Sequence, residues 1–260
     1  MISISTIRSL AVGLAMFALG ACAPVPATST YAPSVGQPGK DVVWVPTPSV
    51  LVDTMLDMAK VTPDDFVIDL GSGDGRTVIA AAMRGARALG IEYEGEMVAL
   101  SRRNAQQARV ADRATFVQQD LFESDFSKAT VVTMFLLPDI NRKLMPKLLS
   151  LKPGTRIVSN SFPIGDWVPD QSIILTSENG CETAWCTAMS WVVPARVVGT
   201  HATPHGELSL DQSFQMLSGT LKTADAMVPV EGRVVGEEVV LKAGERELRG
   251  RVVAGRVTIP

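Results

Sequence analysis

A glycine-rich segment at residues 66–76 limits the possible folds of this chain more than any other part of the sequence. The apolar residues Phe66, Val67 and Ile68 lead into Asp69, and three glycines follow at Gly71, Gly73 and Gly75. This order predicts a buried strand, a tight turn and the start of a helix. Because the backbone of such a turn can approach a nucleotide closely, the segment predicts a nucleotide site in an α/β fold.

The acids around this turn indicate which nucleotide it binds. Asp74 would repel a diphosphate, and Arg76 stands where a dinucleotide fingerprint has its third glycine. A ligand with an amino group, a sulfonium charge and no phosphate would instead be attracted by Asp69 and Asp74. S-adenosylmethionine (SAM) has this chemistry, so we predict SAM as the cofactor. The alternative is an ordinary glycine turn between a strand and a helix.

Two later acids occupy equivalent positions at the ends of predicted strands. The strand 88–91 ends in Glu92, and the strand 115–118 ends near Asp120. An acid about 20 residues past the glycine turn binds ribose hydroxyls, and one at the next strand end can accept from the adenine amino group. Each acid alone is explained as an exposed strand-end residue. Together with Asp69 they predict one cleft, because ligands of open α/β sheets bind at the carboxyl ends of the strands.

Three segments resemble the successive motifs of class I, seven-strand SAM-dependent methyltransferases. They are Asp69 to Arg76, then Gly90-Ile91-Glu92, then Gln119 to Phe122. The resemblance implies a Rossmann-like sheet with helices on both faces, and it covers roughly residues 42–170.

Two proline-containing segments are similar to those of one branch, the non-SET protein-lysine methyltransferases. This branch includes the archaeal lysine methyltransferases and the mitochondrial enzymes that modify the ATP-synthase c-subunit. The segments are Val45-Pro46-Thr47-Pro48 and Phe135-Leu136-Leu137-Pro138, with Asn141 shortly after. Phe135 stands where a tyrosine is usual, so the resemblance does not carry over a role for a tyrosine hydroxyl in handling the substrate amine.

The expected site follows from the strand-end acids, the glycine turn and the two proline segments. Thr47 is expected near the methionine end of SAM, and Phe135 is expected to line the substrate pocket and to offer a π face to a cationic amine. No metal-ligand cluster is expected. The predicted cofactor-binding residues are Asp69, Gly71, Gly73, Asp74, Glu92, Asp120 and Thr47.

Local patterns predict the remaining elements of this region. Thr47 and Pro48 are expected as the N-cap and the first residue of a helix. Asp139 is expected to cap a later helix, which Pro146 should kink or interrupt. Further helices are expected over 77–84 and 96–109, and further strands over 130–135, 155–159, 172–176 and 185–193.

The pattern changes beyond Pro194. Short apolar runs alternate there with glycines and charges, and helical periodicity is absent. The pattern predicts an antiparallel β module of five or six strands over residues 195–260, following a methyltransferase domain over residues 42–194. The sequence assigns no chemistry to this module.

The first residues of the chain resemble a bacterial lipoprotein signal. Arg8 precedes an apolar stretch over 10–20, which is too short to span a bilayer. Leu19-Gly20-Ala21-Cys22 resembles a lipobox, so residues 1–22 are expected to be the signal, with a lipid anchor at Cys22. Residues 23–41, rich in Pro, Ala, Ser, Thr and Gly, are expected to be a flexible linker. The alternatives are an ordinary signal peptide with an incidental cysteine, and a cytoplasmic protein translated from Met16.

The other two cysteines are expected to pair if the chain is exported. Cys181 and Cys186 lie between two β-rich runs, so their spacing predicts a disulfide across a hairpin loop, the alternative being two unpaired thiols. The two histidines, His201 and His205, flank Pro204 without a carboxylate or cysteine between them. We expect these histidines in a surface loop and not in a metal site.

The net charge of −3 gives no electrostatic case for a nucleic acid partner. Three hypotheses for function remain from the sequence. The first is an active methyltransferase that acts on a protein lysine or another small amine. The second is an exported lipoprotein binding module with a degenerate or repurposed SAM pocket, and the third is an envelope interaction protein whose β module is functional. The sequence does not predict an oligomeric state.

Overall fold

The computed structural model of the chain describes residues 31–260. The expected signal segment 1–22, with Met16 and the lipobox residue Cys22, lies outside the described residues. The first part of the expected linker, residues 23–30, also lies outside them.

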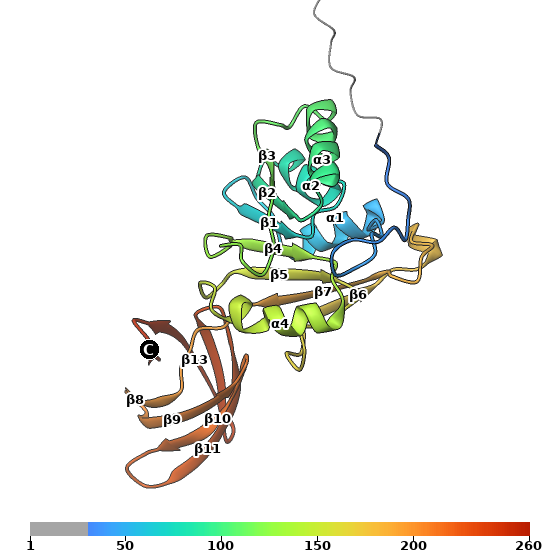
Figure 1. Cartoon of the computed structure of the whole chain (residues 1–260). Coiled ribbons are helices and arrows are strands. Elements are labelled where there is room, and N and C mark those ends of the chain that lie inside the picture. Colours follow the sequence, from blue (N-terminus) through green and yellow to red (C-terminus); the bar gives the residue numbers. More distant parts are fainter. Residues whose placement is uncertain (1–30) are drawn as a thin grey trace, which may run out of the picture. The chain divides into compact units, whose positions relative to one another are not determined.

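A seven-stranded mixed sheet forms the first part of the fold (Figure 1). Its strand order is β3-β2-β1-β4-β5-β7-β6. The first five strands of this order are parallel, and β7 runs antiparallel to both β5 and β6. The strands are β1 (Phe66–Leu70), β2 (Arg87–Glu92), β3 (Ala114–Gln118), β4 (Val131–Met134), β5 (Arg156–Asn160), β6 (Gln171–Ile174) and β7 (Thr187–Val192).

Helices cover both faces of this sheet. They are α1 (Ser49–Met58), α2 (Arg76–Met83), α3 (Gly95–Gln107) and α4 (Pro138–Leu149), with a short 3-10 helix, η1 (Ser177–Asn179), between β6 and β7. Val67 of β1 packs into the core that α1, α2 and α3 share, whereas Ile68 and Leu70 pack into the core beneath α4. Because successive strand residues point to opposite faces, the covered sheet explains the unbroken apolar run before the glycine turn. The predicted α/β fold class is confirmed.

Two expected helix caps are wrong. Pro48, and not Thr47, is the N-cap of α1, and no side chain caps this helix. The hydroxyl of Thr47 instead accepts a hydrogen bond from the amide of Asn160 at 3.3 Å, so Thr47 joins the segment before α1 to the end of β5. Leu137 is the N-cap of α4; Asp139 lies in its first turn and pairs with Arg142 at 3.0 Å.

Pro146 does not interrupt α4, which continues to Leu149. A proline in a helix removes one backbone hydrogen bond and crowds the preceding turn. Leu144 and Leu148, on either side of it, are completely or almost completely buried in the core beneath α4. Packing of this apolar face therefore compensates for the lost hydrogen bond.

Residues beyond Pro194 form a second sheet of seven antiparallel strands in chain order. The expected number was five or six. The segment from His201 to His205 was expected in a surface loop, but residues 199–203 form a strand. His201 lies in this extra strand and is buried, with its ring within hydrogen-bonding distance of the carbonyl of Val197 and of the amide of Val257. The strands are β8 (Gly199–Thr203), β9 (Gly206–Ser213), β10 (Met216–Lys222), β11 (Met227–Val235), β12 (Glu238–Ala243), β13 (Arg246–Val253) and β14 (Arg256–Thr258).

The second sheet has its own apolar core, but polar and aromatic contacts join it to the first. The indole N–H of Trp167 donates to the side-chain oxygen of Gln215 at 2.9 Å, and the amide of Gln215 donates to the carbonyl of Val168 at 2.8 Å. Phe214 stacks on Trp167 with ring centroids 6.1 Å apart. These contacts bury Trp167 completely. The division of the chain at Pro194 stays a prediction.

Among the helices formed by residues 31–260, none has the length and apolar composition needed to cross a bilayer.

Replacing Gln215 with alanine should lower the free energy of unfolding by ~1–3 kcal/mol, because the buried indole N–H of Trp167 would lose its acceptor. Urea denaturation of the full chain measures this change. Gln107→Ala, at an exposed position of α3, is the matched control and should change stability little. Equal stability of both variants would show that the bond from Trp167 contributes nothing to the contact between the sheets.

Candidate active site

One cleft at the carboxyl ends of the parallel strands collects the residues that the sequence singled out. Every predicted cofactor-binding residue and the predicted substrate-pocket residue lines this single cavity. They are Thr47, Asp69, Gly71, Gly73, Asp74, Glu92, Asp120 and Phe135. The position agrees with the rule that ligands of open α/β sheets bind at this edge.

The turn after β1 needs glycine for its backbone conformation and for space. Gly71 and Gly73 have φ angles of +75° and +53°, in the left-handed region that disfavours other residues. A side chain at Gly73 would begin 2.7 Å from the indole nitrogen of Trp44. The amides of Gly71 and Ser72 both donate to the carbonyl of Ile91, which fixes the turn against β2.

Glu92 is held in place by backbone amides. One of its carboxylate oxygens accepts from the N–H of Gly73 at 2.8 Å, and the other accepts from the N–H of Glu94 at 3.0 Å. A carboxylate oxygen can accept more than one hydrogen bond, so both oxygens retain capacity toward the cavity. This arrangement suits a ligand that brings a pair of hydroxyls.

Asp69 is the most strongly perturbed acid in the cavity. It is buried at the end of β1, where its carboxylate accepts a 2.6 Å hydrogen bond from the hydroxyl of Thr133 on β4. Burial raises the pKa of Asp69 to about 7, and the nearby carboxylates of Glu92 and Asp74 act in the same direction. The hydrogen bond from Thr133 opposes this rise. A cation placed beside Asp69 would favour its ionised form.

Asp74 has a structural partner. Its carboxylate pairs with the guanidinium of Arg76 at 2.6 Å, and Arg76 also donates to the carbonyl of Thr47 at 2.9 Å. The arginine that replaces the third glycine of a dinucleotide fingerprint therefore joins the turn to the segment before α1. Asp74 remains in the cavity lining, but with its charge compensated.

Asp120 forms an ion pair with Lys40 and accepts from the backbone N–H of Phe122 at 2.8 Å. The hydrogen bond from Lys40 is the main reason that the pKa of Asp120 lies below its ordinary value. The ammonium of Lys40 also lies 4.7 Å from the ring centroid of Tyr93, next to Glu92. Residues 37–47 thus run along the cavity and cover its end above β2 and β3.

The sequence did not single out Lys40, Trp44, Tyr93 or Thr133 as site residues. Tyr93 directly follows Glu92 at the end of β2, so the same reasoning about strand ends could have predicted it. Thr133 enters the site only through the pairing of β1 with β4, where it lies opposite Asp69. Lys40 and Trp44 belong to a segment without helical or strand periodicity, so its path across the cleft could not be predicted.

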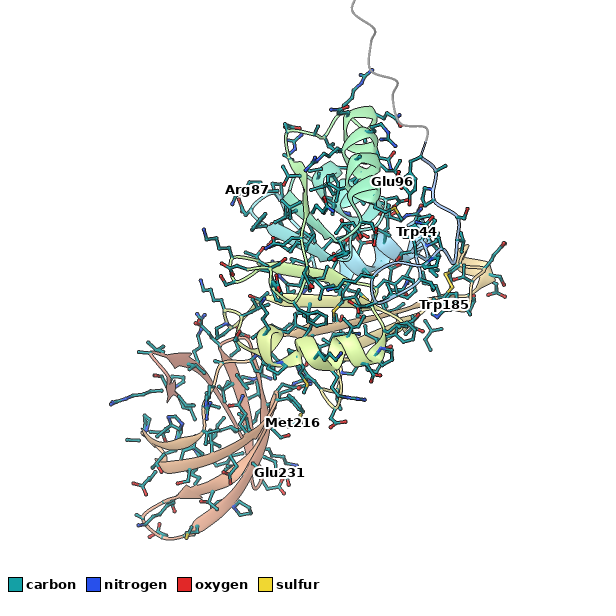
Figure 2. All side chains as sticks on the ribbon, in the orientation of Figure 1. Trp44, Arg87, Glu96, Trp185, Met216 and Glu231 are labelled. Atoms are coloured by element: carbon teal, nitrogen blue, oxygen red, sulfur yellow. A yellow bond between two sulfur atoms is a disulfide. The ribbon has the colours of Figure 1, made fainter. Side chains whose placement is uncertain are left out.

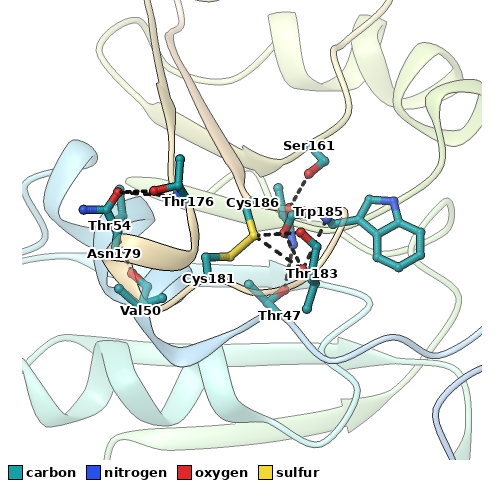
Figure 3. Close-up of a disulfide and its surroundings, with 11 residues drawn as sticks. Thr47, Val50, Thr54, Ser161, Thr176, Asn179, Cys181, Thr183, Trp185 and Cys186 are labelled. Atoms are coloured by element: carbon teal, nitrogen blue, oxygen red, sulfur yellow. Dashed lines mark hydrogen bonds between the residues drawn. A yellow bond between two sulfur atoms is a disulfide. The ribbon is translucent and has the colours of Figure 1, made fainter.

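A predicted disulfide borders the other end of the cleft. Cys181 and Cys186 are bonded, with Cα atoms 6.0 Å apart, which confirms the expected pairing (Figure 3). Trp185, directly before Cys186, lines the cavity with Trp44, and Figure 2 labels both residues.

The residues of the cavity fit SAM. Its carboxylates suit hydroxyl, amino and cationic groups, and they disfavour phosphate. The buried hydroxyl of Ser72, in the cavity lining, has no hydrogen-bond partner within residues 31–260, so the glycine turn retains unused polar capacity. Within the same residues, no cluster of His, Cys, Asp and Glu is arranged to hold a metal ion.

Comparison with known proteins agrees with a SAM site. Residues 69–171 match the ANTKMT methyltransferase domain. A protein-lysine N-methyltransferase of Saccharolobus islandicus (strain REY15A) is 43% identical over 163 residues, which are 62% of this chain and 96% of that enzyme. The lysine N-methyltransferase of the ATP synthase c-subunit from Mus musculus is 36% identical over 148 residues, which are 56% of this chain and 58% of that enzyme.

A solved structure shares the fold of the first sheet. It is described as an RNA methyltransferase from Salinibacter ruber in complex with S-adenosyl-L-homocysteine. It is 47% identical to this chain with a TM-score of 0.54, and the match covers 59% of this chain and 96% of that one.

The fold and the site define a SAM-dependent methyltransferase of the Rossmann-like, seven-strand class. Within that class the chain belongs to the family of the archaeal protein-lysine N-methyltransferase, as the sequence motifs had indicated.

The raised pKa of Asp69 generates a prediction about pH. Protonated Asp69 cannot pair with a cation, so SAM affinity should increase as the pH rises through about 7 and then level off. Between pH 8 and pH 6 the dissociation constant should rise about tenfold. Titration calorimetry at pH 6, 7 and 8 measures it.

Asp69→Asn should bind SAM weakly and without this pH dependence, and without cofactor it should melt at a higher temperature, because no carboxylate is then forced to ionise in a buried site. Asp112→Asn, at an exposed position, is the control and should keep the wild-type profile. An unchanged pH profile in Asp69→Asn would remove Asp69 from the cofactor site.

Proposed function

We propose that this protein transfers methyl groups from SAM to lysine side chains of proteins. The observation that carries the proposal is the convergence of Asp69, Glu92 and Asp120 on one cavity beside a tight glycine turn. Support for the acceptor comes from the relatives, which are named as lysine methyltransferases of the ATP synthase c-subunit and of adenine nucleotide translocase.

The cofactor would lie along the strand ends. We assign Glu92 to the ribose hydroxyls, Asp120 to the adenine amino group, and Asp69 to the ammonium of the methionine part. Gly71 and Gly73 allow the backbone to approach the ligand. The remaining roles are secondary: we assign Thr47 to the methionine end, and Asp74 orients the turn through Arg76.

When bound, SAM supplies a methyl carbon that is already activated by a sulfonium. The protein therefore needs to align a neutral amine, exclude water and let the amine proton leave beforehand. The apolar side chains of the cavity, among them Met134, Phe135 and Leu136, partly desolvate the amine and so lower its pKa. Phe135 has no hydroxyl, so its contribution is shape and a π face.

A protein acceptor fits this chain better than RNA. The Salinibacter protein is described as an RNA methyltransferase, but this chain has a net charge of −3 and six carboxylate residues in the lining of its cavity. RNA binding relies on basic surfaces that neutralise phosphates. We therefore expect no transfer to RNA.

Radiolabelled SAM, incubated with the full chain and either total protein or total RNA of the source organism, tests the proposal. Label should appear in protein and, after hydrolysis, in methyllysine. Asp69→Ala and Glu92→Ala should each lower SAM affinity by about a hundredfold and abolish labelling, since each removes a charged hydrogen-bond acceptor. Asp112→Asn is again the control. Label in RNA or in a free small amine, with none in methyllysine, would reject the protein-lysine assignment.

We also propose that the chain is exported and anchored through a lipid on Cys22. The lipobox resemblance of residues 19–22 supports this location, as does the Cys181–Cys186 disulfide, because such bonds persist in oxidising compartments. Mass spectrometry of the mature N-terminus should find lipidated Cys22. An N-terminus at Met1 or Met16 would place the protein in the cytoplasm, where SAM is made.

A further inference from the structure

Three aromatic rings meet at the end of the cleft opposite Asp120. Phe135 stacks on Phe162 with centroids 6.0 Å apart and planes inclined by 18°. Trp185 approaches Phe135 at 6.3 Å with an inclination of 59°. All three rings line the cavity. They come from segments distant in the sequence, after β4, after β5 and from the loop before β7.

The sheet order shows which end of the cleft this is. Asp120 follows β3 and Glu92 ends β2, on one side of β1, whereas the three rings follow β4 and β5 or precede β7, on its other side. If the proposed cofactor placement holds, the adenosine lies above β2 and β3 and the methionine above β1. The rings then border the methyl group on the side from which an acceptor must approach.

The loop that carries Trp185 is closed covalently. Leu175, directly after β6, donates its N–H to the carbonyl of Cys186, and the Cys181–Cys186 disulfide closes the loop across the hairpin (Figure 3). Inside the loop, the N–H of Trp185 donates to the hydroxyl of Thr183 at 3.2 Å. The side chain of Trp185 is nevertheless 38% exposed, although a tryptophan of a folded core is normally more buried.

The chemistry of aromatic rings indicates which groups the exposed ring of Trp185 could bind. Aromatic faces attract ammonium groups, including methylated ones, and they also pack on aliphatic chains. A lysine side chain combines an ammonium with a four-carbon stem. Phe135 alone offers one face, whereas Trp185 and Phe162 extend the aromatic surface toward solvent.

We propose that Trp185 is a binding residue for the acceptor lysine, that it forms with Phe135 and Phe162 an aromatic channel for the lysine stem and ammonium, and that the Cys181–Cys186 disulfide positions it. The inference rests on the proposed function and concerns residues outside the part of the chain that matches the ANTKMT methyltransferase domain, apart from Phe135 and Phe162.

Trp185→Ala tests the channel in the full chain. The half-saturating concentration of extract protein in the methyllysine assay should rise about tenfold, a size set by cation–π and apolar contacts to one ring. The maximal rate should fall much less, and the SAM dissociation constant should stay within twofold, because the ring is remote from the adenosine end. Trp185→Phe should recover most of the loss. Met216→Ala, at an exposed apolar position of the β module, is the control and should equal the wild type.

The disulfide is tested by combining variants. The double variant Cys181→Ser, Cys186→Ser should reproduce the effect of Trp185→Ala on acceptor saturation while SAM binding is kept. Adding Trp185→Ala to it should produce no further loss, since both changes remove the same contact. Fully additive losses would show that the disulfide does not act through Trp185.

The outcomes separate this inference from the proposed function. A wild-type chain that binds no SAM or forms no methyllysine overturns the proposed function, and the channel with it. A wild type that forms methyllysine, with Trp185→Ala saturating at the same acceptor concentration, overturns the channel alone. Weak SAM binding in both Trp185→Ala and Trp185→Phe would assign the ring to the cofactor site and also overturn the inference.

Discussion

The site depends on one buried carboxylate, that of Asp69, in an otherwise apolar part of the sheet. Asp69 is the next-to-last residue of β1, among core residues, and its carboxylate accepts a hydrogen bond from the hydroxyl of Thr133 on the adjacent strand. Burial raises the pKa of Asp69 to about 7, so without a ligand the carboxyl group is only partly ionised near physiological pH. A cationic ligand beside Asp69 would favour the ionised carboxylate. Binding would therefore offset the unfavourable free energy of burying this acid. In the proposed arrangement, the glycine turn and Glu92 position the rest of the ligand relative to this charge.

The elements around Asp69 divide the cleft into two chemically different ends. Above β2 and β3 the lining is acidic and is covered by the segment that carries Lys40 and Trp44. Above β4 and β5 it is aromatic and is bordered by the loop that the disulfide closes. An acidic end suits the hydroxyl and amino groups of an adenosine, and an aromatic end suits an amine with an aliphatic stem. In the proposed arrangement, the methyl group is transferred from the acidic end of the cleft toward the aromatic end.

Local patterns were sufficient for the sheet and for the strand-end acids, because Asp69, Glu92 and Asp120 each terminate a short apolar run near its own strand. Residues that enter the site through long-range pairing were not predictable: Thr133 requires the register of β1 with β4, and Trp185 requires the closed hairpin. Thr47 was recognised as a site residue but not as the partner of Asn160. His201 was expected in a surface loop because Pro204 makes a helix unlikely there, although the second sheet buries it.

The contact between Trp167 and Gln215 has a consequence for how the chain can be divided. Trp167 is enclosed by side chains that come from both sides of Pro194, and its carbonyl accepts from the indole of Trp191 in β7. Ending the polypeptide before β8 would strip Phe214 and Gln215 from this ring and leave a large apolar face open to water. The carboxyl-terminal sheet is thus part of the scaffold of the catalytic half, and a shortened recombinant form would be prone to self-association at that face.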